Sequence, residues 1–219
     1  MIKKKKRKIE ETVNSATHAF GIAGAIAFSV ILIVKASPHT AWHIVSISLY
    51  GAGLIFLYTS STIFHGSKNL RTKSKLNILD HSAIYVLIAA TFTPLTMVVL
   101  HNAQGWVIFG LMWGMALAGI IYKVWFYKVK MRRLSTWLYL WMSWPIIIGI
   151  VPVIKRMPNI SLWFLLIGCL VYAFSSIFYL KKEIPYGHAI FHLLIMAGST
   201  CHFFCFYYLM TLPLHINHM

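Results

Sequence analysis

The sequence predicts an all-α membrane protein built as one bundle of seven transmembrane helices. Three observations carry this prediction. First, 59% of the 219 residues are hydrophobic, against roughly 45–50% in soluble domains, and the mean hydropathy is +0.72. Second, the apolar residues gather in seven stretches that each approach the roughly 20 residues a helix needs to cross the bilayer. Third, the basic residues between these stretches alternate in density from one connection to the next.

The seven predicted spans follow one another with short connections. They cover residues 17–36, 42–65, 78–100, 104–122, 134–154, 160–180 and 187–210. Prolines occur in the third and fifth spans, where neighbouring helices can satisfy the freed backbone groups. Residues 1–16 are expected to form a basic cytoplasmic N-terminal segment, residues 17–211 the single transmembrane domain, and residues 212–219 a short outer tail.

The distribution of lysine and arginine predicts the orientation of the bundle. With seven spans, 17 of the 20 basic residues fall on the side of the N-terminus, and the other side has Lys35, Lys155 and Arg156. Because positively charged connections stay in the cytoplasm, we expect a cytoplasmic N-terminus and an outer C-terminus. The formal charge of +16 then reflects topology and contact with anionic lipid, so we expect no nucleic-acid partner.

One acidic residue, Asp80, lies inside a predicted span. A carboxylate within the membrane is costly and by default indicates a functional site. The topology places Asp80 near the cytoplasmic face, where the second span ends with Ser61 and His65. The seventh span begins at the same face with His188 and His192. Three helices are therefore expected to bring polar side chains to one layer of the membrane.

These residues have the spacing and chemistry of a zinc site. His188 and His192 are four residues apart and share a helix face, as in helices that bind metal. With His65 they offer three imidazoles, and three protein ligands with an open position are typical of catalytic zinc. We expect Zn²⁺ there, although nickel, cobalt or iron would also accept such ligands. Asp80 would hold a water molecule and accept its proton, and Ser61 would bond Asp80 or a substrate carbonyl. The alternative is a polar packing network without metal.

Other polar residues near this layer allow more than one interpretation. Glu11, Asn14 and His18 form a stripe if their segment is helical. The stripe is either the start of an interfacial helix or a cover over the cytoplasmic mouth of the bundle. His81 projects from another face of the third span and is interpreted as an interhelical hydrogen-bonding group. His202 lies roughly 20 Å farther along the seventh span, too far from the expected ligands to share a metal.

The combination resembles the hemolysin III branch of the progestin and adipoQ receptor family, over roughly residues 10–211. Three segments carry the resemblance: Glu11-x2-Asn14-x3-His18, Ser61-x3-His65 with Asp80 fifteen residues later, and His188-x3-His192. His202 stands at the place of a further family histidine. The resemblance implies seven helices, a cytoplasmic N-terminus and zinc on the three histidines, with Asp80 holding the zinc-bound water.

The resemblance and the predicted site together indicate lipid chemistry. Family relatives include adiponectin receptors, which are associated with ceramidase-type activity, and the bacterial branch is linked to haemolysis and membrane-fluidity homeostasis. We expect a zinc-dependent hydrolase of lipid amide or ester bonds in a bacterial plasma membrane, with membrane lipids as partners. The alternatives are a non-enzymatic membrane-state sensor or receptor with structural zinc, and a cytolytic protein. The substrate and the oligomeric state stay open.

Overall fold

The computed structural model describes residues 2–128, 131–181 and 183–213. Within these ranges the chain is helical and contains no strand. Seven segments are long and apolar enough to cross a membrane, so the predicted seven-helix membrane fold is confirmed. Lys130, Lys182 and residues 214–219 of the predicted outer tail lie outside the described residues.

The helical elements follow the seven predicted spans in order. They are α1 (Ile2–Ala36), α2 (Ala41–Gly66), α3 (Leu70–Pro94), η1 (Leu95–Leu100), α4 (Ala103–Ile121), η2 (Tyr122–Phe126), α5 (Arg132–Trp141), η4 (Trp144–Gly149), α6 (Ile150–Arg156), α7 (Asn159–Leu180) and α8 (Gly187–Thr211). The π-helices η1 and η2 continue α3 and α4, and η4 is a short 3₁₀ helix. The fifth span is thus composed of α5, η4 and α6, where the sequence predicts one continuous helix.

Two helices begin well before the apolar stretches that predict them. α1 begins at Ile2, so the expected basic N-terminal segment is the first part of a helix. α3 begins at Leu70, and the side chain of Asn69 caps it by accepting hydrogen bonds from the backbone N–H groups of Arg71 and Thr72. Asparagine is among the preferred N-cap residues, which explains how α3 starts within a polar segment.

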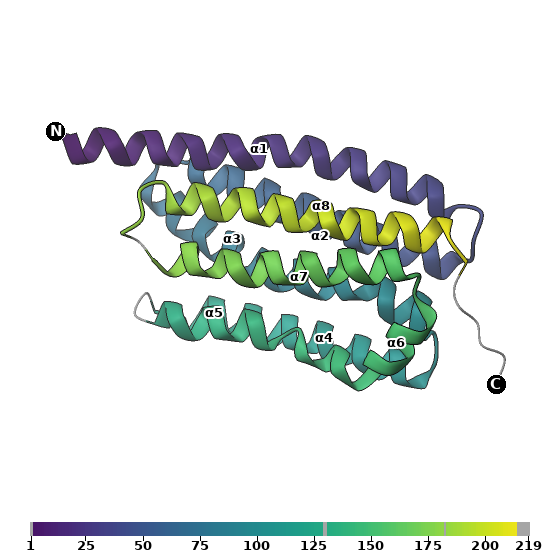
Figure 1. Ribbon diagram of the computed structural model, residues 1–219. Helices are drawn as coiled ribbons and strands as arrows, with labels where there is room; N and C mark the ends of the chain where they lie inside the picture. Colours follow the sequence, from purple (N-terminus) through teal and green to yellow (C-terminus); the bar gives the residue numbers. More distant parts are fainter. Residues whose placement is uncertain (1, 129–130, 182, 214–219) are drawn as a thin grey trace.

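The helices run roughly along one axis, with the N-terminus at one end of the bundle (Figure 1). α1 packs against α2 and α8, α3 against α2, and α7 against α8. α7 and α8 approach each other closely because each carries a glycine at their interface. A Cβ on Gly168 of α7 would lie 2.5 Å from His202 Nε2 of α8, and a Cβ on Gly198 of α8 would meet the ring of Tyr172 of α7. Small residues allow such approach between membrane helices.

The end of the bundle opposite the N-terminus is closed around η1. Pro94 has no N–H to donate, and the chain continues beyond it as π-helix to Leu100, with every residue of η1 buried. Arg156, the last residue of α6, donates from Nη1 to the carbonyl oxygens of Val99 at 3.1 Å and Leu100 at 3.3 Å. These bonds satisfy backbone groups that the end of η1 leaves free.

Candidate metal centre

Three histidines from two helices meet at the end of the bundle where α2 ends and α8 begins. His65 lies in the last turn of α2, and His188 and His192 lie in the first two turns of α8. One ring nitrogen of each lies within 4.8 Å of a ring nitrogen of the other two. The Nε2 atoms of His65 and His188 are 3.1 Å apart. The helix ends therefore bring the three predicted zinc ligands together, and we call them the histidine triad.

The separation between the ring nitrogens of His65 and His188 fits a tetrahedral metal ion. Zn–N bonds of about 2.0–2.1 Å in a tetrahedral site put two ligand nitrogens roughly 3.3 Å apart. The separation of 3.1 Å between His65 Nε2 and His188 Nε2 is close to this value. Two imidazole nitrogens that face each other need a proton or a metal ion between them, since their lone pairs otherwise repel.

The outer nitrogens of two triad members also favour metal binding through Nε2. His65 Nδ1 lies 2.9 Å from Glu11 Oε2, and His192 Nδ1 lies 3.2 Å from the backbone carbonyl oxygen of Asn14. Carboxylate and carbonyl oxygens only accept hydrogen bonds, so both Nδ1 atoms donate. In the neutral imidazole, Nε2 then keeps its lone pair, as a metal ligand must.

Asp80 and Ser61 lie beside the triad. Both line a cavity of about 360 Å³ that also reaches His188 and His192. Ser61 Oγ is buried and lies close to the Asp80 carboxylate, within reach of a hydrogen bond. The hydrogen bond between the two side chains stays a prediction. Both side chains line the cavity and can contact a molecule in it.

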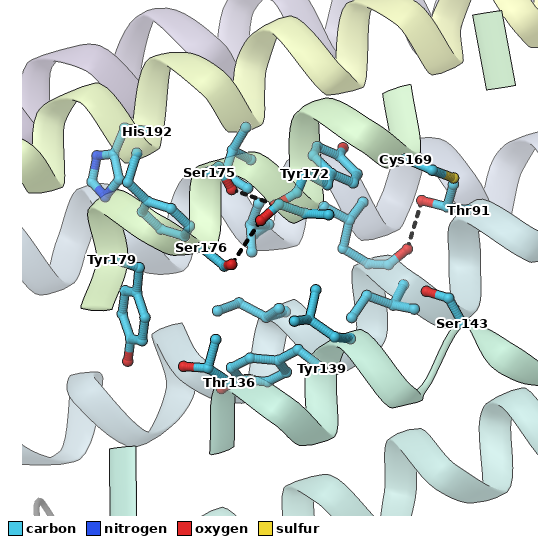
Figure 2. A pocket seen from close by; sticks show the side chains of 18 of the residues that line it. Thr91, Thr136, Tyr139, Ser143, Cys169, Tyr172, Ser175, Ser176, Tyr179 and His192 are labelled. Atoms are coloured by element: carbon cyan, nitrogen blue, oxygen red, sulfur yellow. Dashed lines mark hydrogen bonds between the residues drawn. The ribbon is translucent and has the colours of Figure 1, made fainter. Parts of the chain in front are cut away.

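The walls of this cavity are mostly apolar and come from α2, α3, α5, α7 and α8, with His18 of α1. In Figure 2, Thr136 and Tyr139 of α5 lie across the open space from Ser176 of α7. His192 lies toward one end of the cavity and Cys169 toward the other. Its volume falls within the range of about 300–1,000 Å³ typical of small-molecule sites, so an apolar chain can lie beside the triad.

A second cavity, of about 670 Å³, opens at the same end of the bundle and is lined by polar and charged residues. Glu11, His65 and Arg132 line this mouth. Asp80 and His188 border both cavities. The triad and Asp80 thus occupy the boundary between an apolar chamber and a polar one.

The stripe on α1 covers the triad, which favours the second of its two interpretations. Glu11 accepts a hydrogen bond from His65, and the carbonyl of Asn14 accepts one from His192. The ring of His18 stacks on the ring of His192, with 3.7 Å between centroids and 13° between planes. α1 therefore contacts two of the three triad rings without supplying one.

His81 and His202 stand apart from the triad. His81 Nε2 in α3 lies 2.9 Å from Tyr179 Oη in α7, which is the interhelical hydrogen bond expected of it. His202 is buried in α8, and its Nε2 lies 3.8 Å from Cys169 Sγ. The three cysteines are free.

Two lysines that the sequence assigns to connecting segments belong to helices. Lys73 lies in α3 and donates to Glu11 Oε2 at 2.7 Å. Lys123 lies in η2 with only 2% of its surface exposed, and its Nζ lies 3.6 Å from the ring centroid of Tyr127. For Lys73, the sequence offers one signal that it belongs to the third helix. It precedes Asp80 by seven residues, or two helical turns, and would therefore share a helix face with it.

Comparison with known proteins identifies the family. A protein-family model described as haemolysin-III related matches residues 6–203. The chain belongs to this family. This haemolysin III protein is 40% identical over 197 residues to the Hemolysin-3 homolog of Bacillus subtilis (strain 168), across 90% of this chain and 92% of that protein. It is 38% identical over 205 residues to Hemolysin-3 of Bacillus cereus, across 92% and 93%.

A human protein is also similar to the haemolysin III chain. Monocyte to macrophage differentiation factor of Homo sapiens is 31% identical over 206 residues, across 89% of this chain and 82% of that protein. The predicted relationship to the hemolysin III branch of the progestin and adipoQ receptor family is confirmed. Seven apolar helices and bacterial relatives likewise support the predicted localisation, a multi-pass protein of a bacterial plasma membrane.

Proposed function

We propose that this haemolysin III protein is a zinc-dependent hydrolase of amide or ester bonds in membrane lipids. The observation that carries the proposal is the position of the histidine triad, whose ring nitrogens meet where the apolar cavity joins the polar mouth. A bond between an acyl chain and a polar headgroup belongs at such a boundary.

His65, His188 and His192 would hold the metal. When bound, zinc lowers the pKa of a coordinated water molecule to about 7 and polarises carbonyl oxygens. The chain contributes the donor set of three neutral imidazoles, two of which have their Nδ1 atoms already engaged.

Asp80 and Ser61 would act directly on the reactants. The Asp80 carboxylate accepts a proton from the attacking water as the water oxygen bonds to the acyl carbon, and returns that proton to the leaving nitrogen or oxygen as the C–N or C–O bond breaks. Ser61 Oγ is buried beside Asp80 in the wall of the cavity, and its hydroxyl would bond Asp80 or donate to the substrate carbonyl oxygen.

The two cavities would divide the lipid between them. The acyl chain lies in the apolar cavity, between α5 and α7, and the headgroup faces the polar mouth beside Arg132. The positive-inside pattern of the sequence puts this mouth on the cytoplasmic side. Water and the polar product then exchange with the cytoplasm.

The proposal is tested by measuring hydrolysis of labelled lipid amides and esters by the purified protein in vesicles. We expect turnover that disappears after zinc is stripped with a chelator and returns when Zn²⁺ is added. Turnover that is unchanged in the stripped protein would contradict the proposal. A contaminating hydrolase is excluded by His188→Ala, which is expected to be inactive even with added Zn²⁺.

A second candidate is a non-enzymatic membrane-state sensor in which zinc is structural. One observation favours it: the triad joins the end of α2 to the start of α8, and α1 packs against both helices. Zinc would then fix the relative position of three helix ends. This candidate predicts that stripping zinc lowers the melting temperature while no lipid is hydrolysed by the zinc-loaded protein.

A further inference from the structure

α1 supplies no member of the triad, yet it makes the closest polar contacts to two of its rings. The Glu11 carboxylate lies 2.9 Å from His65 Nδ1, and the Asn14 carbonyl oxygen lies 3.2 Å from His192 Nδ1. Both contacts engage Nδ1, which leaves Nε2 as the free nitrogen on two histidines that come from different helices.

We propose that α1 orients the metal ligands, with Glu11 as the positioning residue that sets the tautomer and ring plane of His65. This inference rests on the proposed metal site and adds to it a function for the N-terminal stripe. Metal-bound histidines commonly donate their second N–H to a carboxylate or a carbonyl, and loss of that partner weakens metal binding. Here both kinds of acceptor come from one helix.

Glu11 is itself held in place from a third helix. Its Oε2 atom accepts hydrogen bonds from Lys73 Nζ of α3 at 2.7 Å and from His65 of α2. Lys73 Nζ also lies 3.5 Å from the backbone carbonyl of His65 and 5.0 Å from the ring centroid of Phe64. The carboxylate thus forms an ion pair with Lys73 and a hydrogen bond with the neutral ring of His65. A half-buried carboxylate with two donors has little freedom to leave its position.

His192 is constrained from two directions by the same helix. Asn14 engages its Nδ1, and the ring of His18 lies parallel to its face at 3.7 Å. His18 is itself buried, with 3% of its surface exposed. These contacts limit rotation of the His192 ring about χ2. The acceptor on Asn14 is a backbone atom, so side-chain substitution cannot remove it, and Glu11 offers the cleaner test.

The test compares Zn²⁺ affinity of Glu11→Ala and Glu11→Gln with that of the wild-type protein. Full-length protein is stripped of metal and titrated with Zn²⁺ against a chromophoric chelator. We expect Glu11→Ala to weaken binding by about 10- to 100-fold. Glu11→Gln is expected to restore most of the loss, because an amide oxygen still accepts a hydrogen bond from His65 Nδ1.

Glu10→Ala is the matched control. Glu10 is the neighbouring carboxylate and lines the same mouth, but it takes no part in the contacts of Glu11 with His65 and Lys73. The Glu10→Ala substitution removes one negative charge from α1, as Glu11→Ala does, but keeps the contact between Glu11 and His65. We expect Glu10→Ala to bind Zn²⁺ as the wild type does, so that loss of one negative charge near the metal is separated from loss of the hydrogen bond.

Two further readouts separate positioning from folding. The melting temperature of the metal-free variants should stay near that of the metal-free wild type. The visible absorption spectrum of the Co²⁺-substituted protein should change in Glu11→Ala and not in Glu10→Ala, since it reports ligand geometry. Equal affinity of Glu11→Ala and Glu10→Ala, or a loss that Glu11→Gln does not reduce, would overturn the inference. A wild-type protein that binds no metal would instead refute the proposed metal site.

Discussion

Replacing Asp80 with asparagine removes a proton acceptor with little change of shape. If Asp80 is the general base, turnover should fall about 100- to 10,000-fold, the usual contribution of such a group. At 1.36 kcal/mol per tenfold change in rate, this raises the activation barrier by about 2.7–5.4 kcal/mol. Asp80 is not a member of the triad and takes no part in the contacts of Glu11 with His65 and Lys73. Zinc content and melting temperature should therefore change little.

The assay follows release of fatty acid from lipid substrate at saturating concentration, alongside zinc analysis and thermal unfolding of the same preparation. Glu183→Gln is the matched control, because Glu183 is another carboxylate at the polar mouth but is not a member of the triad and takes no part in the contacts of Glu11 with His65 and Lys73. It should keep wild-type turnover. A purified, zinc-loaded Asp80→Asn protein with wild-type turnover would refute the assignment of Asp80 as the base.

Three further predictions concern the metal, the helix packing and the cavity. Zn²⁺ added to stripped protein at 100 times its dissociation constant should stabilise it by about 2.7 kcal/mol, seen as a rise in melting temperature; an unchanged melting temperature would exclude specific binding to the folded state. Gly168→Ala places a Cβ 2.5 Å from His202 Nε2 and should destabilise the protein by about 1–3 kcal/mol in thermal unfolding. Gly114→Ala, with no atom within 4 Å of its Cβ, should be neutral, and equal losses would contradict the packing account. Ser176→Trp narrows the cavity of Figure 2 and should lower lipid turnover with zinc content unchanged; full turnover would place the acyl chain elsewhere.

The triad was predictable because two simple rules meet there. Helical periodicity puts His188 and His192 on one face, and alternation of basic connections puts the end of the second span at the same depth as the start of the seventh. Those rules specify the depth of a residue in the membrane and the helix face on which it lies. They do not specify which side chains of other helices it contacts. The structure adds that the rings of His65 and His188 come within hydrogen-bonding distance.

The cover supplied by α1 and the roles of two lysines required the structure. Hydropathy detects where a helix is apolar, not where it begins, so the sequence predicts the polar first turns of α1 and α3 as segments outside the spans. The cap at Asn69 starts α3 within its polar segment, and the polar part of α1 packs against His65 of α2. That extension brings Lys73 to Glu11 and Glu11 to His65. The contacts between side chains of α1, α2 and α3 depend on how far each helix is rotated about its own axis. The apolar pattern does not determine this rotation, because the helix faces toward lipid are apolar as well.

Metal analysis of the purified protein decides whether the histidine triad holds a metal ion. We expect one zinc ion per chain in the wild type and its loss in both His188→Ala and His192→Ala. His202→Ala, which removes another buried histidine of α8 away from the triad, should keep the metal. Unchanged metal content in the His188→Ala and His192→Ala proteins would contradict the account.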